Sequence, residues 1–300
     1  MTVDDRLPAP VQGAMRAIRV ACGQFRAGSL SDNVGIMRDQ SGDARSRGAE
    51  IIVFPELALT GYLPAPDVLD HCQPLDGEGV ASMRDVAREH GIGIVFGLPE
   101  LTGGVRYNTM LALDATGAIA GIYRKIHLWK TEDWAQPGTS IDPYELAGVT
   151  CASWICYDTR FPEIGRAAAL AGADLCVIST AWLGPGDEWE LAVRSRALDN
   201  SVFVAGSDII NPDPSLRTCG RSLIVSPKGH VLARAAEDAP GVIVADLDPE
   251  EQQAQKDRVP LLDDRRLETL LGSAGDGRDR SMLQSMAGSS RGPAIWRPGA

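Results

Sequence analysis

EIIVF (50–54) and LCVIST (175–180) are the two stretches that decide the fold. Each is a short apolar run rich in β-branched residues, which is typical of a buried strand, and Pro55 ends the first of them. A strand that is apolar at successive positions needs both faces of its sheet covered. We therefore expect two sheets that stack face to face, with helices on their outer faces.

The same order of elements occurs in both halves of the chain. The first half predicts strands at 18–25, 50–54 and 92–98, a hairpin at 107–113 and 118–124, and helices at 31–47 and 78–90. The second half predicts strands at 149–155, 174–180 and 201–207, a hairpin at 221–225 and 230–234, helices at 162–171 and 187–200, and a last strand at 242–247. This order predicts an α/β fold, a four-layer α-β-β-α sandwich of two stacked mixed sheets.

No linker divides the two halves, so we expect one domain over residues 18–271. Residues 1–17 form an N-terminal extension. Residues 272–300 are rich in glycine, serine and arginine and hold few large apolar side chains, which predicts a flexible C-terminal tail.

Charge and composition exclude several classes of partner. The net charge is -11, from 29 basic and 40 acidic residues, and no basic run offsets it, so we expect no nucleic-acid partner. Residues 1–11 lack the pattern of a signal peptide, and no apolar stretch reaches the roughly 20 residues of a membrane span. The six cysteines are scattered through a long chain, which favours reduced thiols and a cytoplasmic protein.

Three reactive side chains each follow the carboxyl end of a predicted strand: Glu56, Lys125 and Cys156. Ligands bind at this edge of open α/β sheets, so the three are expected to share one site. Cys156 lies where a strand turns into a helix, and the positive end of a helix favours a thiolate.

The alternative for a cysteine is packing as a small hydrophobic residue, which suits Cys22, Cys151 and Cys176 inside apolar strands. Cys156 suits it less, because charged and turn-forming residues follow at once. His127 is a conceivable base, but Glu56, which follows an apolar strand and Pro55, is the better one. No histidine–cysteine cluster has metal-ligand spacing, so we expect no metal.

Three motifs in this order resemble those of the nitrilase superfamily, the carbon–nitrogen hydrolases. They are FPELALTGY (54–62), YRKIHLW (123–129) and CYDTRFPE (156–163), and YNTMLALDATG (107–117) and DEWELAVRSRALDN (187–200) also match. The resemblance runs from about residue 18 to residue 266.

The resemblance implies an α-β-β-α sandwich that forms a homodimer or a higher homo-oligomer and needs no cofactor. It implies Glu56 as base, Lys125 as oxyanion cation and Cys156 as nucleophile on a small amide. Glu132 resembles a second glutamate of the aliphatic-amidase branch. The backbone N–H of Tyr157 is a further expected donor to the oxyanion.

The substrate is less defined. CYDTRFPE resembles the omega-amidase (Nit-type) branch more than the true nitrilases, whose cysteine is usually followed by Trp-Glu. This favours an amide over a nitrile, while N-carbamoyl substrates and a catalytically silent binding relative stay open. Trp134, Trp182 and Trp189 are candidate pocket walls, with ordinary core packing as the equal alternative.

Overall fold

The computed structural model describes residues 15–63 and 66–266. The chain divides into two compact units, Met1–Pro260 and Leu261–Ala300, and all helices and strands discussed below belong to the first. The predicted domain boundary at residue 271 lies outside the described residues. The predicted tail, 272–300, and most of the predicted extension lie outside the described residues.

The first sheet has six strands in the order β12-β1-β2-β3-β4-β5. Its three inner strands β1, β2 and β3 run parallel, and β12, β4 and β5 add antiparallel strands on either side. The bounds are β12 (Gly241–Leu247), β1 (Ile18–Gln24), β2 (Ile51–Val53), β3 (Gly93–Thr102), β4 (Val105–Leu113) and β5 (Ile119–Arg124). Helices α1 (Leu30–Ser46) and α2 (Glu78–His90) pack against this sheet.

The second sheet repeats the plan in the order β11-β10-β9-β8-β7-β6. Strands β7, β8 and β9 run parallel, with antiparallel strands on either side. The bounds are β11 (Val231–Arg234), β10 (Leu223–Val225), β9 (Phe203–Asp208), β8 (Leu175–Thr180), β7 (Val149–Ile155) and β6 (Tyr144–Leu146). Helices α3 (Pro162–Leu170) and α4 (Gly186–Asn200) pack against it.

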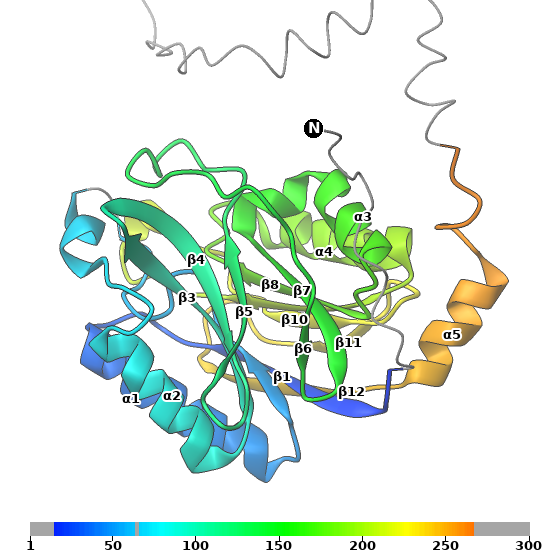
Figure 1. Ribbon diagram of the computed structural model, residues 1–300, viewed down its shortest axis with the longest axis horizontal. Coiled ribbons are helices and arrows are strands. Elements are labelled where there is room, and N and C mark those ends of the chain that lie inside the picture. The colour runs from blue at the N-terminus through cyan, green and yellow to red at the C-terminus, as the bar shows by residue number, and fades with distance from the viewer. Residues whose placement is uncertain (1–14, 64–65, 267–300) are drawn as a thin grey trace, which may run out of the picture. The chain divides into compact units, whose positions relative to one another are not determined.

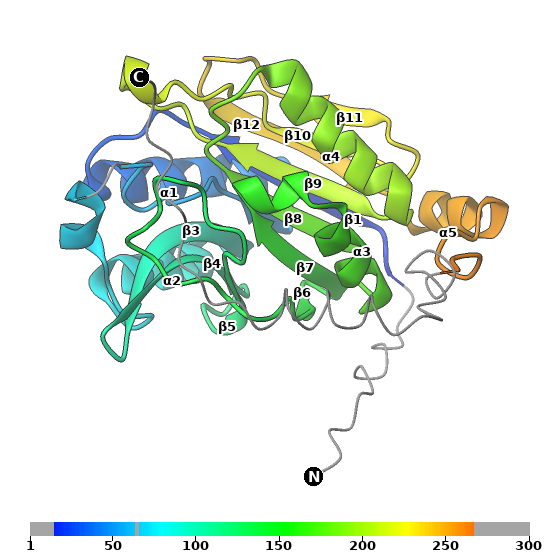
Figure 2. The same ribbon diagram turned by 90° about the horizontal axis from the view of Figure 1, so that it is seen from above.

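The two sheets stack through their inner faces, where β1 contacts β9, β2 contacts β8, and β4 contacts β7. Figure 1 shows the two sheets together, and Figure 2 shows α1 and α2 on the side away from α3 and α4. Every residue of β2 and β8 is buried, as the two apolar runs predicted. The predicted four-layer sandwich of mixed sheets is therefore confirmed.

Two elements were not predicted. Strand β6 has only three residues, too few for a periodic pattern. Helix α5 (Pro249–Arg258) is almost wholly polar, so it has no apolar stripe. It is held instead by a capping side chain, Asp248, which accepts from the Glu250 N–H at 2.9 Å, and by buried Gln252, which donates to the carbonyl of Asp174.

No helix in the described ranges is long and apolar enough to cross a membrane.

Candidate active site

The three side chains singled out from the sequence meet at one edge of the stacked sheets. Glu56 follows β2, Lys125 follows β5, and Cys156 follows β7, so two come from the first sheet and one from the second. The Lys125 ammonium donates to Glu56 Oε1 at 2.7 Å, and both charges lie close enough to Cys156 to shift the pKa of its thiol. The structure thus assembles the expected group.

Glu56 is fixed by its backbone and by both of its oxygens. The side chain is completely buried, and its Oε2 accepts from the Ala181 N–H of the second sheet at 2.9 Å. Leu57, the next residue, has a positive φ of 49°, which bends the chain sharply after the glutamate. Gly97 of β3 makes room for this bend, because a Cβ there would lie 2.3 Å from the Leu57 nitrogen.

Lys125 lies between two carboxylates. Its Nζ donates to Glu56 Oε1 and to Glu132 Oε1, each at 2.7 Å, and the side chain has no exposed surface. Burial lowers the pKa of Lys125, but the charges of Glu56 and Glu132 outweigh it and hold the pKa well above its ordinary value. The amine is therefore a permanent cation at the centre of the site.

Glu132 is the second carboxylate on Lys125 and is almost fully buried. Its Oε2 accepts from the Trp129 N–H at 2.7 Å, so the short turn between these residues aims the carboxylate inward. Burial raises the pKa of Glu132 to about 7, with Lys125 opposing the shift and Glu56 adding to it. The site therefore holds one carboxylate that changes protonation near neutral pH.

Cys156 has a positive φ of 46° at the end of β7, in a left-handed conformation that few non-glycine residues adopt. Its Sγ lies 3.7 Å from the carbonyl oxygen of Ala181. Burial and the charge of Glu56 raise the pKa of the thiol well above its usual range, against the effect of Lys125. The helix that begins at Cys156 is a short 3₁₀ turn, Cys156–Arg160, and α3 starts only at Pro162, so the thiol does not lie at the N-terminus of an α-helix as expected.

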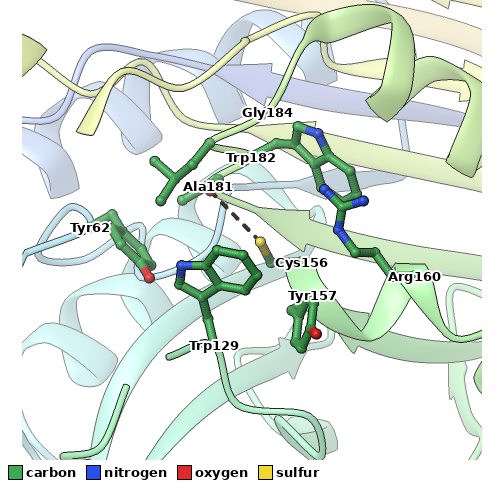
Figure 3. Close-up of a pocket in the computed structure, with 9 residues that line it drawn as sticks. Tyr62, Trp129, Cys156, Tyr157, Arg160, Ala181, Trp182 and Gly184 are labelled. Atoms are coloured by element: carbon green, nitrogen blue, oxygen red, sulfur yellow. Dashed lines mark hydrogen bonds between the residues drawn. The ribbon is translucent and has the colours of Figure 1, made fainter. Parts of the chain in front are cut away.

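A pocket with an empty volume of about 430 Å³, part of it open to solvent, lies over the cysteine. Figure 3 shows Tyr62, Trp129, Tyr157 and Trp182 around the sulfur. Most of its lining is apolar, so it suits a small organic molecule with few charges. The Arg160 guanidinium, which also lines it, lies 4.5 Å from the centre of the Trp182 ring and forms an ion pair with Glu188.

The three tryptophans of the sequence analysis divide between pocket and core. Trp182 lines the pocket. Trp134 does not line it, and packs half-buried against the hydrophobic core beside α1 and α2. Trp189 is completely buried, 5.3 Å from Trp182 between ring centres.

His127, the alternative base, pairs with the Asp158 carboxylate at 2.7 Å and stacks on Phe161.

Several contributors were not predicted as site residues: Tyr62 and Arg160 of the pocket wall, and Trp129 and Asn108 beside the carboxylates. Trp129 supplies both a pocket wall and the N–H that aims Glu132. Asn108, in the stretch YNTMLALDATG, donates its side-chain amide to Glu56 Oε1 at 2.8 Å and to Glu132 Oε1 at 3.0 Å. The register of β4 and β5 brings it there, and the Lys125 N–H donates to its carbonyl at 2.9 Å.

Comparison with known proteins agrees with this geometry. The family model described as carbon–nitrogen hydrolase matches residues 11–257. The chain belongs to the carbon–nitrogen hydrolase family. Its assignment to the nitrilase superfamily on three motifs is thereby confirmed, as is its class, a hydrolase of carbon–nitrogen bonds.

Two curated relatives of this carbon–nitrogen hydrolase are amidases. It is 35% identical to a 2-oxoglutaramate amidase of Bacillus subtilis over 75% of the chain and 88% of the relative. It is 30% identical to an omega-amidase of Homo sapiens over 84% of the chain and 96% of the relative. The predicted likeness to the omega-amidase branch is therefore confirmed.

Solved structures give the same result for the fold. A carbon–nitrogen hydrolase from Helicobacter pylori G27 superposes with a TM-score of 0.78 at 22% identity, covering 85% of this chain and 97% of the other. A cysteine-to-alanine variant of the amidase from Nesterenkonia sp. AN1, in complex with butyramide, has a TM-score of 0.75 at 28% identity. That match covers 84% of this carbon–nitrogen hydrolase and 95% of the amidase.

Proposed function

We propose that the protein hydrolyses small amides to a carboxylic acid and ammonia through a thioester on Cys156. The observation that carries this proposal is the buried Lys125 ammonium, bound at 2.7 Å to two carboxylates beside a thiol that opens into an apolar pocket. A base, a cation and a nucleophile in one place are the requirements of acyl transfer. The relatives act on amides, which supports the same reaction here.

Acylation starts from the thiol. Glu56 accepts the proton of Cys156 while Sγ attacks the amide carbon, and the carbonyl oxygen becomes an oxyanion beside the Lys125 ammonium and the Tyr157 N–H. A donor of this kind contributes about 3–4 kcal/mol to the transition state. The protonated Glu56 then gives its proton to the leaving nitrogen, so that the C–N bond breaks and ammonia departs.

Deacylation uses the same groups in reverse. Glu56 takes a proton from a water molecule, whose oxygen attacks the thioester carbon. The C–S bond breaks, the acid leaves, and Cys156 recovers its proton from Glu56. Glu132 keeps the Lys125 ammonium aligned throughout, because one of its oxygens binds the ammonium and the other binds the Trp129 N–H.

The substrate that we propose is an amide with a carboxylate at its far end. Arg160 is the cation of the pocket wall, its guanidinium lies over the Trp182 ring, and it forms an ion pair with Glu188 through Nη1. The guanidinium has further N–H groups for a second carboxylate. The two amidase relatives support this class, since 2-oxoglutaramate is itself an amide with a carboxylate.

The test is ammonia release from a panel of butyramide, glutaramate, N-carbamoyl amino acids and nitriles. We expect turnover of the two amides and no turnover by the Cys156→Ala variant. Arg160→Met should lower kcat/KM for glutaramate about tenfold or more, and much less for butyramide, because only glutaramate carries the carboxylate. Turnover by Cys156→Ala, or by nitriles alone, would refute the amidase proposal.

We also propose a cytoplasmic homodimer or higher homo-oligomer. Free cysteines throughout support the reducing compartment. Two leucines of α4 are exposed, Leu191 at 67% and Leu198 at 46%, and apolar side chains of this size on one helix support a subunit contact. Sedimentation of the wild type and of a Leu191→Glu variant tests it, and a monomeric wild type would refute it.

A further inference from the structure

Asn108 is a buried polar residue to which the reaction scheme above gives no role. It lies in β4 with no exposed surface, between the carboxylates of Glu56 and Glu132. A side-chain amide nitrogen carries two hydrogens, and these two contacts use both of them. Both partners are carboxylate oxygens that accept, so the nitrogen, and not the carbonyl oxygen, must face them.

The geometry around Asn108 is a closed ring of four polar atoms. Lys125 Nζ donates at 2.7 Å to the same two oxygens, Glu56 Oε1 and Glu132 Oε1, that accept from the Asn108 amide. Each oxygen therefore receives one charged and one neutral donor. Two carboxylates held by one ammonium repel each other, and the amide is the second group that offsets this repulsion.

The charged and titratable groups that act on this ring come from five segments. They are Glu56 after β2, Tyr62 in the loop that follows, Lys125 after β5 with Glu132 in the next turn, Cys156 after β7, and Asp208 of β9. Lys125 is the one cation among them. The acidic groups around the ring therefore outnumber its cations. The neutral Asn108 amide stabilises both ionised carboxylates without adding charge.

We propose that Asn108 is a positioning residue that holds Glu56 and Glu132 aligned on Lys125 and favours their ionised forms, so that Glu56 stays available as the base. The proposal rests on the proposed function, because it assigns Asn108 a role in the same reaction. Asn108 does not touch the pocket, and it acts through the two carboxylates. Its removal favours a proton on the carboxylate pair, which then titrates as a unit at higher pH.

The experiment measures the rate of alkylation of Cys156 by iodoacetamide between pH 4 and 9, with the site of modification found by mass spectrometry. This probe needs the base but no known substrate. Asn108→Leu, which has no donor, should move the acid limb of the rate profile up by roughly one pH unit, the effect of losing a hydrogen bond to an ionised group. Asn108→Asp keeps the volume but puts a third carboxyl group between Glu56 and Glu132, so it should move the limb further.

Thr109→Val is the matched control. Thr109 is the next residue of β4, equally buried, and donates to Glu100 at 2.7 Å on the other side of the strand. It should leave the acid limb unchanged even if the variant is less stable, as thermal unfolding of all variants will show. Should Asn108→Leu fail to fold, Asn108→Asp alone decides the result.

The outcomes separate the two proposals. An acid limb within about 0.2 pH unit of the wild type in a folded Asn108 variant overturns the role of Asn108, as does an equal shift in Thr109→Val. Equal, slow labelling of Cys156 and the other cysteines in the wild type overturns the proposed nucleophile instead.

Discussion

Replacement of Lys125 by methionine tests the charge arrangement on which the site depends. Methionine keeps most of the side-chain length but removes the ammonium from between Glu56 and Glu132. All three side chains are almost or completely buried, so the carboxylates lose their one cation without gaining water. Removal of one partner from a buried ion pair costs about 3–5 kcal/mol of unfolding free energy.

The loss of unfolding free energy in Lys125→Met depends on pH, and the direction of this dependence follows from the pKa of Glu132. Its pKa in the folded protein, about 7 in the wild type, is above the ordinary 4.5, and loss of Lys125 raises it further. A carboxyl group whose folded pKa is raised stabilises the fold while protonated, and that stability is lost as pH rises toward the folded pKa. The difference between Lys125→Met and wild type should thus be about 3–5 kcal/mol at pH 8 and smaller at pH 5.

Urea denaturation at pH 8 and pH 5 measures this difference in stability. Ammonia release should fall by about 10²–10³-fold or more, because the proposed oxyanion cation is gone. Lys256→Met is the control, because Lys256 is 35% exposed and its 3.1 Å ion pair with Asp174 is near the surface. It should cost less than about 1 kcal/mol at either pH. If Lys125→Met is as stable as Lys256→Met at pH 8, the electrostatic account of the site is wrong.

Two further substitutions test how Glu56 and Glu132 are held. Gly97→Ala should lower the unfolding free energy by about 1–3 kcal/mol and reduce turnover, because the new Cβ would lie 2.3 Å from the Leu57 nitrogen and displace Glu56. Gly35→Ala, with no atom near its Cβ, is the control in the same urea and ammonia assays, and equal effects would contradict the steric argument. Glu132→Gln should abolish a loss of up to about 3 kcal/mol in stability between pH 4.5 and 7, measured by urea denaturation. An unchanged pH slope would show that Glu132 is not the group that titrates there.

The fold was predictable where a buried segment has a recognisable apolar pattern in its own sequence. Strands β2 and β8 are buried on both faces, and their residues are accordingly apolar at successive positions. Helix α5 has no such apolar pattern, since its buried side chains are Gln252 and Gln255. Gln252 donates to the carbonyls of Asp174 and Ser201, which other segments supply. Whether a polar side chain is buried depends on its hydrogen-bond partners. These come from distant parts of the chain, so the local sequence does not show it.

The same reason explains which site residues could be predicted from the sequence and which could not. Glu56 and Lys125 were predicted because a charged residue directly after a strand is a local signal, and ordered motifs reinforced it. Asn108 was not, because its role comes from the β4–β5 register, which pairs Thr109 with Arg124 and so sets Asn108 beside Lys125. Trp129 and Trp134 are five residues apart in one loop, and only the path of that loop decides which ring faces the pocket.

The surroundings of the Cys156 thiol bear on how the proposed reaction begins. A helix end was expected to favour the thiolate, but the pKa of this thiol is set by burial and by the Glu56 charge, which together exceed the effect of Lys125. Both effects favour the protonated form of the thiol. In the proposed reaction, attack on the amide passes the thiol proton to Glu56, which then acts as the acid for the leaving nitrogen. The raised pKa of the thiol is compatible with the proposed amide hydrolysis, in which the poor leaving group must be protonated and the proton of Cys156 reaches it through Glu56.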